Sequence, residues 1–209
     1  MKKLAFFLSL AIFTLVALPA CDDDSDSPLE SADFKTFNEN MRSLWTDHVL
    51  WTRNVIINIV DDAPGTTEAV NRLLQNQEDI GDAIKPYYGD AAGEGLTTLL
   101  REHITLAADI LTAAKAGDTN TFNAKNTDWY ANADEIAAYL NTANPEFFGL
   151  ADMKAMMKEH LDLTLAEAVA RLEGDYAADV ATFDLIYEQI LMMADMLAEG
   201  IANQFPDKF

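Results

Sequence analysis

With 209 residues and 35 acidic against 14 basic side chains, the chain carries a net charge of −21 at pH 7. This charge excludes nucleic acid and anionic lipid headgroups as favoured partners, because both repel an acidic surface. It favours a cation or a basic protein as partner, although solubility alone is a sufficient reason for an acidic surface. Cys21 is the only cysteine, so no disulfide can form within the chain and apolar burial must hold the fold together.

Residues 1–20 have the pattern of an export signal. Two lysines precede an apolar run over residues 4–18, and this run of about 15 residues is shorter than the roughly 20 that a membrane-spanning helix needs. The run ends in Leu-Pro-Ala-Cys at residues 18–21, which resembles the Leu-x-small-Cys box of bacterial lipoprotein signals. The resemblance implies cleavage before Cys21, lipid attachment to Cys21, and anchoring of an exported protein to the periplasmic or extracellular face of a bacterial membrane. The alternative is a plain secretory signal followed by an incidental cysteine.

An acidic tether, residues 21–31, follows the predicted signal. After the cysteine its sequence DDDSDSPLES has no apolar periodicity, which predicts a solvated segment. The remaining residues, 32–209, are enough to bury one core and are predicted to form one domain.

Helical periodicity begins directly after the tether. The first predicted helix spans about residues 32–60 and ends at the sequence DDAPG. The second begins at Thr66 or Thr67 and ends at Lys85, before Pro86, because proline lacks the N–H that a helix interior requires. The third spans about residues 91–116 and ends at a glycine.

Three more helices follow in the second half of the chain. The fourth begins near residues 118–119 and ends before the sequence NTANP. The fifth spans about residues 150–173 and is ended by Gly174, and the sixth begins after Asp175 and continues to about Gln204. No segment alternates as a β-strand does. Short connections between long helices favour antiparallel neighbours, so the sequence predicts an all-α fold, an up-and-down antiparallel helical bundle of about six helices.

The three histidines, His48, His103 and His160, take inward positions in the apolar registers of the first, third and fifth helices. These helices run parallel if the chain direction alternates, so the three side chains are predicted to meet at one depth. Successive histidines are about one helical hairpin apart, which is consistent with an internal repeat and also with chance echoes among amphipathic helices. A buried imidazole needs a hydrogen-bond partner, since an unpaired buried polar group costs about 1–3 kcal/mol.

Partners for these imidazoles are expected at mid-length on the second, fourth and sixth helices. The candidates for a ligand or metal site, besides the histidines, are Glu78, Asp134, Glu135, Glu188 and Gln189. Other polar side chains at similar positions are Gln77, Asp79, Asn132 and Asp184.

A divalent metal is one expected occupant of this layer, because zinc and non-haem metals accept imidazole and carboxylate ligands. The alternative is a hydrogen-bonded polar layer that only fixes the helix register. The spacing disfavours metal, since the Glu-x-x-His motif of di-iron bundles would need glutamate where the chain has Trp45, Leu100 and Met157. A methionine face beside His160 would suit Cu(I), but methionine at helical spacing is more often core packing.

Several segments, taken in order over about residues 44–209, carry a family resemblance. They are LWTDHVLWTR, RLLQNQEDIGDAIKPYYG, REHI, WYANADEIAAYL, EHLDLTLAEAVARL and the terminal QFPDKF. The chain resembles a family of small all-helical bacterial proteins without a settled function, some of which carry the labels acetylglutamate kinase or glycosyltransferase. Those enzymes use α/β folds with glycine-rich nucleotide sites, so the resemblance implies a helical fold and no catalytic residue. It also implies that a fourth inward histidine is missing, because relatives have histidine where this chain has Gln189.

The sequence leaves three functions open. The first is a lipid-anchored, non-enzymatic protein of the cell envelope that binds a small ligand or a metal cation through the buried layer. The second is a metal-dependent enzyme that uses the same layer. The third is a scaffold in which the layer only fixes helix register and the acidic surface meets a basic partner. No glycine-rich phosphate loop, Gly-x-Ser-x-Gly elbow or nucleophilic cysteine in the predicted domain supports catalysis directly.

Overall fold

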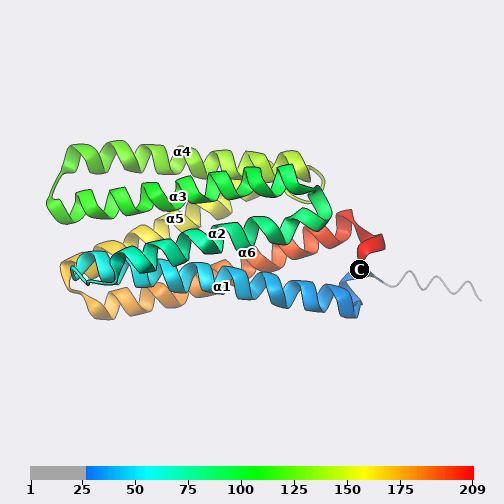
Figure 1. The fold of residues 1–209 in the computed structure, drawn as a ribbon, viewed down its shortest axis with the longest axis horizontal. Coiled ribbons are helices and arrows are strands. Elements are labelled where there is room, and N and C mark those ends of the chain that lie inside the picture. Colours follow the sequence, from blue (N-terminus) through cyan, green and yellow to red (C-terminus); the bar gives the residue numbers. More distant parts are fainter. Residues whose placement is uncertain (1–26) are drawn as a thin grey trace, which may run out of the picture.

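Six long helices form one antiparallel bundle (Figure 1). The computed structural model describes residues 27–209, and its helices are α1 (Ala32–Val60), α2 (Thr66–Tyr88), α3 (Asp90–Ala116), α4 (Thr119–Ala143), α5 (Leu150–Glu173) and α6 (Tyr176–Gln204). The described part contains no strand, so the predicted all-α fold is confirmed. The predicted signal, Cys21 and the first part of the tether lie outside the described residues. No helix within residues 27–209 combines the length and the apolar character needed to cross a membrane.

The helices close into a ring around the bundle axis. Each helix packs against the one before and the one after it, and α6 also packs against α1. In addition α1 contacts α3 and α5, so these three helices of like direction approach the centre. The start of α1 and the C-terminus lie at the same end of the bundle (Figure 1). The side chains at the middle of α1, α3 and α5 therefore come together inside it.

Local capping chemistry sets most helix ends. Asp118 and Asp175 cap α4 and α6 by accepting a backbone N–H from the first turn. Gly117 and Gly174 end α3 and α5 with φ angles of 70° and 76°, a left-handed conformation that glycine adopts without strain. The predicted ends of α1, α5 and α6 are confirmed. The predicted end of α4 is too early, because the helix continues to Ala143.

The prediction that α2 ends at Lys85 is wrong, because the helix continues through Pro86 to Tyr88. Proline lacks the N–H that would bond to the residue four positions earlier, but the last turn still closes because Gly89 N–H donates to the Lys85 carbonyl at 2.8 Å. The Tyr87 ring stacks on that of Phe209, with centroids 5.3 Å apart. Packing of the C-terminal segment thus holds a last turn that local sequence alone disfavours.

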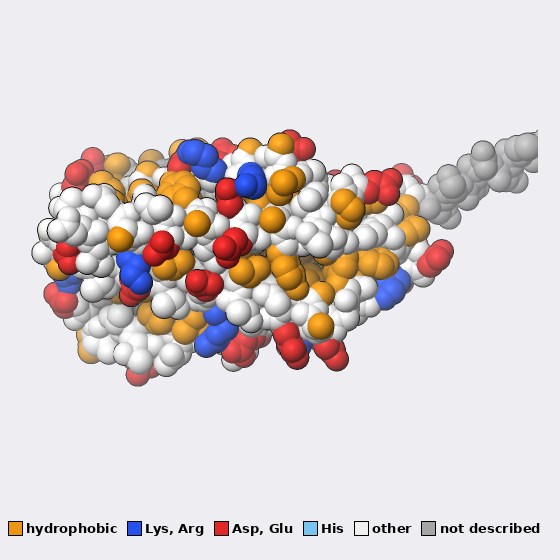
Figure 2. Space-filling view, turned by 90° about the horizontal axis from the view of Figure 1, so that it is seen from above, with side chains coloured by type: hydrophobic (Ala, Val, Ile, Leu, Met, Phe, Trp, Pro, Cys, Tyr) orange, Lys and Arg blue, Asp and Glu red, His pale blue; other side chains and the backbone are white. Residues whose placement is uncertain are grey.

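The surface mixes charges of both signs. On the face drawn in Figure 2, acidic and basic side chains are interspersed with small hydrophobic patches. Many carboxylates form ion pairs with neighbouring lysine or arginine side chains, for example Asp134 with Lys154 and Asp109 with Lys125. This face has no area of uniform acidic charge, so it gives a basic protein partner no local support.

Helices α2 and α3 approach closely where both carry glycine. A Cβ atom on Gly93 would lie 2.6 Å from the carbonyl oxygen of Gly81, and a Cβ on Gly81 would lie 2.7 Å from that of Gly93. Both distances are far below van der Waals contact. The packing of α2 on α3 therefore requires the absence of a side chain at these positions.

Replacing Gly93 with alanine is expected to destabilise the bundle. Overpacking costs about 1–3 kcal/mol, which outweighs the gain of up to about 1 kcal/mol that alanine brings to a helix interior. The matched control is Gly65→Ala, where an added Cβ meets no atom within 4 Å and φ is −88°. Urea unfolding should show a lower free energy of unfolding for G93A and a change within about 0.5 kcal/mol for G65A. Equal stability of G93A and the wild type would show that the two helices are free to separate.

Candidate functional site

His48, His103 and His160 lie together in one buried layer. Their exposed fractions are 3%, 3% and 4%, which confirms the prediction that all three face the core. The ring centroids of His48 and His160 are 5.7 Å apart. A charge on His160 would lower the pKa of both other imidazoles, so the three rings are close neighbours.

In the α3–α4 hairpin and in the α5–α6 hairpin, one amide side chain contacts both the histidine and a backbone carbonyl of the preceding helix. His103 Nδ1 lies 2.8 Å from Asn132 Oδ1, and the amide nitrogen of Asn132 donates to a carbonyl of α3 at 3.2 Å. His160 Nδ1 lies 3.3 Å from Gln189 Oε1, and the amide nitrogen of Gln189 donates to a carbonyl of α5 at 3.2 Å. In both cases the amide follows the histidine by 29 residues. Because the amide oxygen accepts, Nδ1 carries the proton and Nε2 keeps a lone pair.

In the α1–α2 hairpin two amide side chains make these contacts, one with the backbone carbonyl and the other with the histidine. Asn76 Nδ2 donates to the Leu44 carbonyl at 2.9 Å, and Gln77 Nε2 lies 3.3 Å from His48 Nδ1, again 29 residues apart. Gln77 Nε2 also donates to the Leu73 carbonyl at 2.8 Å, which fixes the orientation of this amide. The same nitrogen donates to Asn76 Oδ1 at 3.1 Å. Both of its hydrogens therefore have a closer acceptor than His48 Nδ1.

Burial keeps all three imidazoles neutral. It lowers the pKa of His103 to about 3 and the pKa of His160 to about 4. Burial, followed by the two neighbouring imidazoles, lowers the pKa of His48 well below its ordinary value. The amide hydrogen bonds oppose these pKa shifts only in part. At neutral pH the layer therefore presents three uncharged imidazoles, and Nε2 of His103 and of His160 can accept a hydrogen bond.

Three more polar atoms beside the layer have no hydrogen-bond partner within residues 27–209. They are Nε1 of Trp45, Nε1 of Trp129 and Oε1 of Gln77, and none of these residues is more than 6% exposed. The Trp45 ring centroid is 5.5 Å from that of His48, and the Trp129 ring centroid is 5.2 Å from that of His103. An unpaired buried polar group costs about 1–3 kcal/mol. Each of these groups therefore lacks the protein hydrogen bond that would offset the cost of its burial.

The carboxylates predicted to join the histidines lie elsewhere. Glu78 pairs with an arginine of α3 at 2.7 Å, and Asp134 pairs with a lysine of α5 at 2.8 Å, both at the surface. Glu135 and Glu188 are exposed. Of the predicted site residues on these helices only Gln189 lies in the layer, together with two other amides expected at mid-length, Gln77 and Asn132. The expectation of a His/carboxylate layer is therefore corrected to a His/amide layer.

The geometry does not favour the predicted divalent metal. Among residues 27–209 no three His, Cys, Asp or Glu side chains come together in a way that could hold a metal ion. Two methionines of the Cu(I) alternative, Met153 and Met157, are packed in the core.

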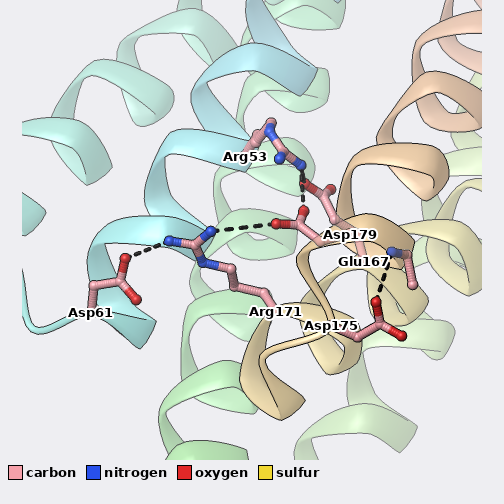
Figure 3. Close-up of polar contacts among 7 residues, drawn as sticks. Arg53, Asp61, Glu167, Arg171, Asp175 and Asp179 are labelled. Carbon is pink, nitrogen blue, oxygen red and sulfur yellow. Dashed lines mark hydrogen bonds and ion pairs between the residues drawn. The ribbon is translucent and has the colours of Figure 1, made fainter.

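A second buried polar cluster lies between α1, α5 and α6 (Figure 3) and was not predicted from the sequence. Arg53 donates to Glu167 and, at 2.6 Å, to Asp179. Arg171 donates to Asp179 at 3.4 Å and to Asp61. Glu167 and Asp179 are each 1% exposed. Burial raises the pKa of Glu167 to about 7, although Arg53 opposes the shift.

Comparison of the chain with protein-family models, with curated proteins and with solved structures finds no match. The family resemblance described above therefore stays a prediction, and the argument for function depends on the site itself.

The two clusters predict opposite dependences of stability on pH. A histidine with a lowered folded pKa binds fewer protons folded than unfolded near pH 5.5, so it makes the free energy of unfolding fall as pH falls below about 6.5. Glu167, with a raised folded pKa, binds more protons folded and makes the free energy of unfolding rise as pH falls from about 7. Three histidines outweigh one glutamate, so the wild type is expected to lose stability on acidification.

Variants separate the two contributions. His103→Gln should make the fall between pH 6.5 and 4.5 shallower, and Glu167→Gln should make it steeper, each by roughly 1.4 kcal/mol per pH unit. Urea unfolding at several pH values measures these slopes. Because the two slopes should change in opposite directions, each variant serves as a control for the other. A change in the same direction in both variants would contradict the predicted pKa shifts of His103 and Glu167.

Proposed function

We propose that this protein is a non-enzymatic, lipid-anchored binding protein of the bacterial cell envelope, and that its buried His/amide layer binds a small uncharged ligand. The observation that supports binding is the group of unpartnered atoms, Trp45 Nε1, Trp129 Nε1 and Gln77 Oε1, beside three neutral imidazoles. A ligand that both accepts and donates hydrogen bonds would satisfy these groups. An uncharged ligand suits the layer because no ionised side chain lies in it.

The two alternatives have weaker support. A metal-dependent enzyme would need a carboxylate base near the histidines, but Glu78, Asp134 and Glu188 lie at or near the surface. A scaffold whose layer only fixes register accounts for the three His–amide hydrogen bonds. It does not account for two buried indole N–H groups without acceptors, because a purely structural layer gains nothing from leaving donors unpaired.

The proposed location at the cell envelope depends on the N-terminal sequence. The Leu-Pro-Ala-Cys box would place a lipid on Cys21, and the acidic tether would then separate the bundle from the membrane. The net charge of −21 agrees with this separation, because an acidic domain is repelled by anionic headgroups.

Mass spectrometry of the natively purified protein tests the binding proposal. We expect the wild type to carry an additional organic mass that is released on unfolding, and H103Q/H160Q to carry much less because both Nε2 acceptors are lost. The matched control, E135Q/E188Q, changes two exposed carboxylates and should retain the ligand. Elemental analysis belongs to the same experiment. A stoichiometric metal without an organic ligand would contradict the proposal and favour the metal alternative.

The variant Cys21→Ser tests whether a lipid on Cys21 anchors the protein to the membrane. This variant should leave the membrane fraction and should not incorporate a labelled fatty acid, because the thiol that receives the lipid is absent. Ser25→Ala, a neighbouring change in the tether, should behave as the wild type. Retention of C21S in the membrane with no labelling of the wild type would reject lipid anchoring.

A further inference from the structure

Helix α6 exposes more apolar side chain than any other helix of the bundle. Most of the exposed large hydrophobic residues within 27–209 lie on it, namely Tyr176, Val180, Leu185, Tyr187 and Met192. Met192 is 60% exposed and Leu185 is 53% exposed. These two residues are two helical turns apart, so they lie on the same face of the helix. Exposed apolar area bordered by polar residues is typical of an interaction site.

The contact between His160 on α5 and Gln189 on α6 shows which way this face points. His160 Nδ1 lies 3.3 Å from Gln189 Oε1. Four apolar side chains lie about one turn before or after these two residues, namely Met156 and Leu163 on α5 and Leu185 and Met192 on α6. Because α5 and α6 are antiparallel neighbours, both pairs turn to the same, outer side of the contact. Met156 and Leu163 are half-buried and packed against the core. We call these four residues the α5–α6 face.

Carboxylates without a basic partner border the α5–α6 face. Glu159, Glu188 and Glu199 are exposed, and none of them forms an ion pair within residues 27–209. Helix α6 contains no lysine or arginine. On α5, Lys154 pairs with a carboxylate of α4 at 2.8 Å and Lys158 lies over an aromatic ring of α4, so both point away from α6. The face therefore combines an apolar centre with uncompensated negative charge.

This combination selects among possible occupants. A second copy of the chain, with its own net charge of −21, would bring like charge to the contact, and so would an anionic lipid surface. A basic amphipathic helix instead offers apolar side chains at i, i+3, i+4 and i+7 with lysine or arginine beside them. The flexible thioether of methionine adapts to apolar side chains of different shape.

We propose that the α5–α6 face docks a basic amphipathic helix of a partner protein. The apolar side of that helix lies on Leu185 and Met192, and its basic side chains pair with Glu159 and Glu188. The face lies outside the buried His/amide layer, so this interaction does not depend on a ligand in the layer.

The probe is a synthetic peptide of about 18 residues, or five helical turns, made of leucine and lysine with leucine at helical spacing. The target is the full chain in nanodiscs of zwitterionic lipid, and empty nanodiscs measure the peptide that binds lipid alone. Methionine methyl signals, assigned with Met→Leu variants, report the place of binding. The signals of Met192 and Met156 should move, whereas that of Met41, which is 1% exposed on α1, should not.

Two control peptides separate the apolar from the electrostatic part. A scrambled leucine/lysine peptide has no apolar face, and a leucine/glutamate peptide has the same apolar face with the opposite charge. Each should bind at least about tenfold more weakly than the probe. Binding of the probe should also weaken as salt is added, because salt screens exposed charges. Equal affinity for the leucine/glutamate peptide would overturn the inference.

Variants of exposed apolar residues test the proposed contact. L185Q/M192Q should weaken binding of the probe about tenfold or more. L50Q/V169Q, which changes apolar residues that are 47% and 40% exposed on α1 and α5, should bind within about twofold of the wild type. Circular dichroism checks that each variant keeps its helical content. Wild-type affinity in L185Q/M192Q would overturn the inference.

Variants of exposed carboxylates test the charge complementarity. E159Q/E188Q should weaken binding severalfold, whereas E68Q/E102Q, which removes the same charge from exposed positions on α2 and α3, should not. Equal effects of the two variants would show general attraction to an acidic protein and would overturn the inference. Movement of the Met192 signal when the protein alone is concentrated would assign the face to a second copy, which would also overturn it.

Discussion

A buried imidazole needs a hydrogen-bond partner, and this chain meets that need three times in the same way. Each histidine on α1, α3 or α5 is joined to an amide that follows it by 29 residues on the next helix. A shift of one residue along either helix would turn the side chain by about 100° and break the contact. The layer therefore fixes the register of all three hairpins. The repeated spacing gives the bundle an approximate threefold internal pattern, which the sequence alone left open between repetition and chance.

The pattern is broken in the first hairpin, and the break has chemical consequences. There Asn76 donates to the backbone carbonyl of Leu44 and Gln77 contacts His48, whereas a single amide makes both contacts in the other hairpins. Gln77 Oε1 is left without a partner within the described chain. The hydrogen-bonding environment of His48 therefore differs from that of His103 and His160.

The sequence predicts the helices well because their ends depend on local chemistry. Asp175, for example, caps the start of α6, and Gly174 ends α5 in the left-handed conformation. It also predicts that the histidines face inward. It names the partners Gln77, Asn132 and Gln189 but does not separate them from acidic neighbours, since adjacent residues such as Gln77 and Glu78 point about 100° apart and a small error in register exchanges one for the other. The sequence could have indicated that Glu167 is buried, because it lies two helical turns after His160 on the same face of the helix. The sequence did not indicate its partner Arg53, since that contact depends on how α1 and α5 pack.

The distribution of charge determines what the buried imidazoles can do at neutral pH. General acid–base catalysis is most efficient when the pKa of the catalytic group lies near the working pH. Burial holds the pKa of His103 near 3 and that of His160 near 4, so these imidazoles are poor proton acceptors at neutral pH and act through hydrogen bonds. Glu167 has a pKa of about 7, but it is 1% exposed and paired with Arg53. It lies two helical turns from His160 along α5, and the layer of histidines and amides itself contains no ionised side chain.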